Sequence, residues 1–170
     1  MTIVSTATLL VAFIAAIVDV SKRRIPNVLT FGAAGGALLY HVATSGPTGA
    51  AIAVTGWLVG FALFVPFFAL GGMGAGDVKL IAALGAWLGP LGALQLAAAT
   101  AIAGGITAVV VILQQRYGWQ ALSNLRLLFS HWRINGVSAL PELTLAASTG
   151  PRLAYAVPIL FGTLGVLWWR

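Results

Sequence analysis

Cysteine and charged residues are scarce or absent in this chain, and their scarcity excludes several classes of protein. Its 170 residues include no cysteine and only three acidic side chains, against nine lysine and arginine residues. Without cysteine there is neither a disulfide framework nor a cysteine-based zinc site. Charged residues make up 7% of the chain, far below the roughly 25% of an average soluble domain. An ordinary soluble domain is therefore excluded, and acid-base chemistry has very few carboxyl groups to draw on.

Apolar residues fill the chain instead. They account for 60% of it, and the mean hydropathy is +1.01. A membrane-spanning helix needs roughly 20 apolar residues, and the chain contains about six such stretches, separated by short polar or Gly/Pro segments. We therefore predict an all-α, polytopic integral membrane protein that forms a single domain over residues 1–170. The predicted spans cover about 3–19, 28–42, 51–70, 78–88, 91–113 and 153–169.

Basic residues indicate how these spans are oriented. Residues 22–24 read Lys-Arg-Arg directly after the first span, and such clusters stay in the cytoplasm. The first apolar run reads as a retained span rather than a cleaved signal peptide, so the N-terminus is predicted outside. The net charge of +6 follows this topology and does not indicate nucleic-acid binding.

The segment 114–152 carries further arginines and is predicted to be cytoplasmic. Apolar side chains recur there at helical spacing, which predicts an amphipathic helix lying in the membrane interface. These residues are Leu122, Leu125, Phe129 and Trp132.

The glycines within the spans and the two histidines are expected to have structural roles. Gly56 with Gly60, and the pairs at 35–36 and 104–105, lie within spans and would let helices approach closely. His41 and His131 are far apart in the sequence, and we expect neither to bind a metal. No other cofactor is expected.

Two aspartates stand out against this apolar background. Asp19 ends the first span, and Asp77 begins the fourth after the glycine-rich segment 71–76. The predicted topology places both at the same depth on the cytoplasmic side, and an ionisable residue at such a place is a candidate functional residue. Two neighbouring carboxyl groups share one proton, so that one can activate a water while the other donates to a carbonyl. This is the chemistry of aspartic peptidases.

Other roles for the two aspartates remain open at this point. Asp19 precedes Lys22 and Arg23 at helical spacing and could form ion pairs with them. Asp77 could be a helix N-cap. A small transporter or channel subunit could use both to bind a cation or relay protons, and a scaffold could use both as caps. The glycine run lacks the Gly-Lys-Ser/Thr ending of a phosphate-binding loop.

Two motifs in the chain resemble those of one family. Residues 74–80 read GAGDVKL and resemble the GxGD signature of the type IV prepilin peptidases, with its Lys-Leu continuation. Asp19 lies seven residues before Pro26, as the first catalytic aspartate of that family does. Residues 155–159 with Gly162 resemble the closing segment of the family. The resemblance implies that Asp19 and Asp77 are catalytic. Residues that it implies in a supporting role are Gly74, Gly76, Lys79, Pro26 and Asn27.

The resemblance also implies a substrate and a location. Prepilin-like proteins with a basic leader would be cleaved at the cytoplasmic face of the inner (cytoplasmic) membrane. Residues 22–24 and Lys79 are expected to meet lipid headgroups, leaving the aspartates and Glu142 to face the substrate. Long family members carry an N-terminal segment with paired cysteines, so methyltransferase activity is not expected here. The chain is similar to the short peptidases of tight-adherence (Flp) pili, with archaeal preflagellin peptidases as a related group.

Overall fold

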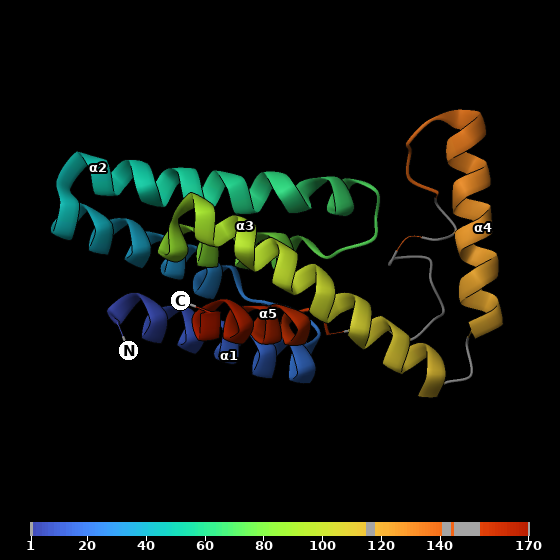
Figure 1. Ribbon diagram of the computed structural model, residues 1–170, viewed down its shortest axis with the longest axis horizontal. Coiled ribbons are helices and arrows are strands. Elements are labelled where there is room, and N and C mark those ends of the chain that lie inside the picture. The colour runs from blue at the N-terminus through green and yellow to red at the C-terminus, as the bar shows by residue number, and fades with distance from the viewer. Residues whose placement is uncertain (1, 115–117, 141–143, 145–153, 170) are drawn as a thin grey trace.

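The regular structure of the protein is helical, as the sequence predicts. The computed structural model describes residues 2–114, 118–140, 144 and 154–169, and these ranges contain helices and no strand (Figure 1). α1, α2 and α3 are long and apolar enough to cross a membrane, and α5 is a shorter apolar helix. The helices are α1 (Ile3–Lys22), α2 (Asn27–Ala69), α3 (Ala75–Gln114), α4 (Gly118–Asn135) and α5 (Ala156–Trp169).

α2 and α3 are each divided into two halves by a glycine followed by a proline. Gly46 has φ 57° and ψ −139°, and Gly89 has φ 74° and ψ 176°. Glycine tolerates a positive φ without steric cost, and the proline that follows has no N–H to continue the helix. Figure 1 shows the chain reversing direction within α2. Both turns were predicted, but the expected loop at 44–49 is helical except at Gly46.

Two helices extend further than predicted. α1 continues past residue 19 to Lys22 and ends where Arg23 adopts a left-handed conformation with φ 52°. α3 begins at Ala75 rather than at 78. Hydropathy marks where a helix leaves the apolar layer, whereas hydrogen bonding continues until the backbone is interrupted. Asp19 and Asp77 therefore both lie inside helical turns. The predicted start of the last span at 153 lies outside the described residues.

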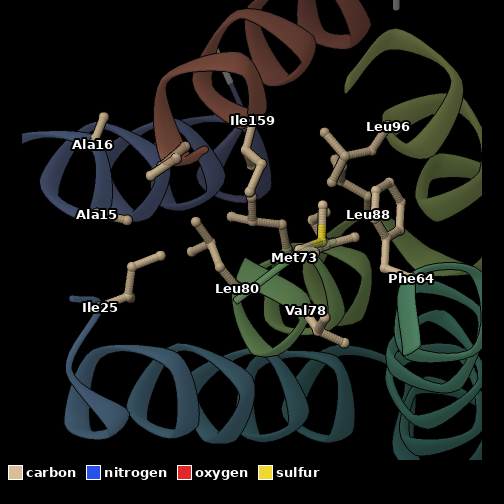
Figure 2. Close-up of a cluster of buried hydrophobic side chains, with 14 of the residues drawn as sticks. Ala15, Ala16, Ile25, Phe64, Met73, Val78, Leu80, Leu88, Leu96 and Ile159 are labelled. Carbon is tan, nitrogen blue, oxygen red and sulfur yellow. The ribbon is translucent and has the colours of Figure 1, made fainter. Parts of the chain in front are cut away.

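The first half of α3 is the centre of the bundle. Every residue from 80 to 88 is buried, and a helix that is apolar all round is packed on all sides. Figure 2 shows Leu80 and Val78 of this half among side chains from other helices, including Ala15 of α1, Phe64 of α2 and Ile159 of α5. The end of this half that carries Asp77 is therefore held by three neighbouring helices.

Glycines allow α2 to approach this central segment closely, as predicted. A Cβ atom on Gly56 would overlap the carbonyl oxygen of Gly85, and one on Gly60 would lie 2.9 Å from the carbonyl oxygen of Ile81. The prediction of close approach is wrong for Gly105, which has nothing within 4 Å of the same position, and for Gly35, in the other half of α2, which is equally open. Gly35 borders an apolar groove of about 270 Å³ between the two halves of α2.

α4 stands apart from the other helices. Figure 1 shows it running across their direction, beyond the end at which α2 connects to α3. None of its residues is buried. The ring of His131 hydrogen-bonds Ser138 Oγ at 2.9 Å and the Asn135 amide at 3.2 Å, a contact that closes the C-terminal end of the helix.

The contrast between Gly56 and Gly35 gives a stability prediction. Gly56→Ala should lower the stability by about 1–3 kcal/mol, because the new methyl group forces the two backbones apart. Gly35→Ala in the same helix should leave it unchanged or slightly higher, because alanine favours helix and the space is open. Thermal unfolding in detergent compares the two. Equal midpoints would contradict the close approach of α2 and α3.

Candidate active site

Asp19 and Asp77 line one cavity of about 360 Å³. Asp19 comes from the last turn of α1 and Asp77 from the first turn of α3, so the two are brought together from distant parts of the chain. The other lining residues are Arg23, Arg24, Ile25, Asn27, Gly74, Ala75, Gly76 and Lys79.

Asp19 is the more enclosed of the two aspartates. Its side chain is 7% exposed, and its Oδ2 accepts a hydrogen bond of 3.2 Å from the backbone N–H of Ala156 in α5. Its own carbonyl oxygen accepts from Arg23 N at 2.8 Å, the bond that ends α1. The sequence did not indicate Ala156, because a backbone donor has no side-chain signature. The only pointer was its place in the segment that resembles the family's closing motif.

Asp77 is the third residue of α3, and its carboxyl group turns back toward the start of the helix. Its N–H donates to the carbonyl oxygen of Gly74 at 3.1 Å, and the Gly74 amide faces its carboxyl group. A Cβ on Gly74 would lie 3.0 Å from Asp77 Oδ2. The N-cap interpretation of Asp77 is therefore wrong, because α3 already begins at Ala75. Glycine at 74 leaves room for the carboxyl group.

Tyr155 directly precedes α5, next to the residue that binds Asp19. Its hydroxyl oxygen lies against Gly104 of α3, where a Cβ would be 2.8 Å away.

Gly76 joins the two motifs by direct packing. A Cβ at this position would lie 3.2 Å from the Cβ of Ile25 and 3.6 Å from its backbone nitrogen. Ile25 is buried, and Pro26 follows it as the N-cap residue of α2. The Pro26 carbonyl oxygen accepts from Leu29 N at 3.1 Å. The connection between α1 and α2 thus rests on the glycine that precedes Asp77.

Lys79 and Asn27 form a second link between α3 and α2. Lys79 Nζ donates to Asn27 Oδ1 at 3.0 Å and lies 5.4 Å from the centre of the Phe31 ring. Both contacts direct the ammonium group toward α2. The structure therefore gives Lys79 partners within the protein, where the sequence predicted lipid headgroups.

The remaining candidates lie elsewhere. Glu142 falls outside the described residues. His41 Nε2 contacts the carbonyl oxygen of Trp87 at 3.1 Å, in the part of α2 near its reversal. Across the described ranges, no group of three or more His, Cys, Asp or Glu side chains is placed to hold a metal ion.

Together, the fold and the cavity define a helical membrane protein with a paired carboxyl site. The model of the type IV leader peptidase family matches residues 6–109, a range that contains both aspartates. The chain belongs to this family.

Curated relatives agree with this membership. The chain is 36% identical over 103 residues to a type 4 prepilin-like proteins leader peptide-processing enzyme of Escherichia coli O78:H11 (strain H10407 / ETEC), covering 56% of the chain and 38% of the relative. It is 32% identical over 153 residues to a prepilin leader peptidase/N-methyltransferase of Dickeya chrysanthemi, covering 86% of the chain and 41% of the relative. A prepilin leader peptidase/N-methyltransferase of Aeromonas salmonicida is 42% identical over 78 residues, covering 42% of the chain and 27% of the relative. The chain thus spans less than half the length of these relatives. No solved structure matches it.

The packing of Gly76 gives a second stability prediction. Gly76→Ala should lower the stability by about 1–3 kcal/mol, because its methyl group meets the buried Ile25 at a position where little can move. Gly72→Ala is the matched control, since its Cβ would lie at an ordinary distance of 3.6 Å from the Phe67 carbonyl oxygen. Denaturant unfolding in detergent measures both variants. A control variant as unstable as Gly76→Ala would refute the role of this contact.

Proposed function

We propose that the protein is an aspartic endopeptidase that removes the leader peptide from type IV prepilins. The observation that carries this proposal is the meeting of Asp19 and Asp77 in one cavity, each supplied by a different helix. The names of the curated relatives support the reaction class. The family model matches residues 6–109, a range that includes both aspartates.

The chemistry needs only the two carboxyl groups and a water molecule. One carboxylate takes a proton from the water, and the water oxygen forms a bond to the scissile carbonyl carbon. The other carboxyl group gives its proton to the carbonyl oxygen. As the resulting tetrahedral intermediate collapses, one of its hydroxyl groups returns a proton to the second aspartate. The C–N bond breaks, and the leaving amine takes up the proton that the first aspartate accepted.

Other motif residues act through the position of the aspartates. Gly74 leaves space for the Asp77 carboxyl group, and Gly76 packs against the connection that follows Asp19. The Lys79–Asn27 hydrogen bond ties the two motifs together. We assign these residues, with Pro26, a supporting role.

The proposed topology has six spans, an external N-terminus and a site facing the cytoplasm across the inner membrane. The breaks at Gly46 and Gly89 support the count, since they divide α2 and α3 into two spans each. Basic residues 22–24 lie at the end of the bundle that carries the cavity, which supports the orientation.

α4 is proposed to lie in the membrane interface, in contact with lipid. Its direction across the other helices (Figure 1) and its exposed apolar side chains, such as Leu125 and Phe129, support this placement.

Prepilins of tight-adherence (Flp) pili with a basic leader are the proposed substrates.

Replacing either aspartate tests the proposed reaction. Asp19→Asn and Asp77→Asn should each reduce leader removal by about 10²–10⁴-fold, because an amide neither accepts the proton from water nor donates one to the carbonyl oxygen. The assay co-expresses a tagged Flp-type prepilin and follows its change in size on a gel, at matched abundance of each variant in the membrane. Gly35→Ala is the control and should cleave at the wild-type rate. Cleavage that survives in either asparagine variant would exclude the paired mechanism.

The absence of native cysteine makes the topology directly testable. Ser45→Cys, at the reversal of α2, should react with a membrane-impermeant maleimide in intact spheroplasts. Ser130→Cys, on α4, should react only after the membrane is permeabilised. Both serines are exposed in the structure, so neither result depends on burial within the protein. The opposite labelling pattern would reverse the proposed orientation.

A further inference from the structure

We propose that the N-terminal turn of α5 is a positioning element for catalysis, in which the Ala156 amide fixes the Asp19 carboxyl group within the cavity. This inference rests on the proposed function, because it assigns a role within the same site. Ala156 is a positioning residue rather than a catalytic one, since it would act only through Asp19.

The two groups satisfy each other's hydrogen-bonding needs. Ala156 is the first residue of α5 and is fully buried. The first N–H groups of a helix have no acceptor within that helix, so a buried one needs a partner from elsewhere. Asp19 Oδ2 supplies it at 3.2 Å, on a side chain that is itself 7% exposed. A helix N-terminus also favours a neighbouring negative charge.

α5 is in turn held in place by α3. The Tyr155 phenol lies against Gly104 of α3. A Cβ on Gly104 would be 2.8 Å from the Tyr155 hydroxyl oxygen. About two turns further along α5, a Cβ on Gly162 would lie 2.8 Å from the backbone nitrogen of Thr100. These close contacts set the position of α5 along the second half of α3. The start of α5 is therefore fixed relative to the helix that carries Asp77.

α1 depends on this arrangement because α5 is its main neighbour. It packs mainly on α5 and to a lesser extent on α3, and it makes little contact with α2. Figure 1 shows α5 lying alongside α1. The position of the Asp19 carboxyl group relative to that of Asp77 is thus set by two packing contacts, that of α5 on α3 and that of α1 on α5. Loss of the Ala156 donor should leave Asp19 free to rotate while substrate binding is retained.

Ala156→Pro removes the donor while preserving the helix start. Proline is favoured at the first helical position, where its φ is already suitable, and its missing N–H is the one that bonds Asp19. We expect kcat to fall roughly 10- to 100-fold, the effect of a small misplacement of a reacting group, with KM nearly unchanged. Ala156→Gly keeps the N–H and should retain kcat close to that of the wild type. A loss confined to KM, or an equal loss in the glycine variant, would overturn the proposal.

Amide hydrogen exchange tests the contact without reference to activity or to the folding of the proline variant. In Asp19→Ala, the Ala156 amide should exchange roughly 10- to 100-fold faster than in the wild type, in proportion to the loss of a hydrogen bond to a charged group. Val157 is the internal control, because its N–H donates to the Ala154 carbonyl oxygen at 3.1 Å and should be unaffected. Unchanged exchange at Ala156 would overturn the proposal. Faster exchange in Asp19→Ala, combined with a wild-type protein that cleaves no prepilin, would uphold the link to Asp19 and refute the proposed function.

Discussion

Close contact between the backbones of α2 and α3 is the constraint on which the bundle depends. Gly56 meets Gly85, and Gly60 meets Ile81, at distances that no larger side chain would allow. This contact encloses the first half of α3, so that its residues are apolar on every side. Asp77 stands where this segment leaves the core. Its location is therefore a result of helix packing, and the glycine-rich connection before it serves to bring the chain into the centre of the bundle.

The two aspartates have different surroundings, which suits a pair with different tasks. Asp19 is almost fully enclosed and is bonded to a backbone amide of α5. Asp77 is partly exposed in the cavity and lies beside the flexible-backbone residue Gly74. Environments that distinguish two carboxyl groups are the usual basis for separating acid from base. The asymmetry arises from the fold, since the residue types are the same.

Much of this arrangement could be predicted from the sequence, because it depends on local signals. Apolar stretches identify the helices, and the Gly-Pro pairs at 46–47 and 89–90 identify the turns. The two aspartates follow from the scarcity of other acidic residues. Helix ends were less predictable, since α1 extends in polar sequence to Lys22. The contact with Ala156 could not be predicted, because it depends on how α5 packs and involves only a backbone group.

The Asp19–Ala156 hydrogen bond also orders events during biosynthesis. Its partners are 137 positions apart in the chain, so at ribosomal speed the carboxyl group precedes its donor by roughly 7–27 s. During this interval the first helix is already made, and its aspartate must be solvated by water or by the insertion machinery. The site is completed only when α5 docks. A nascent chain therefore lacks the finished cavity until α5 has been made, which separates the insertion of α1 from any reaction at this site.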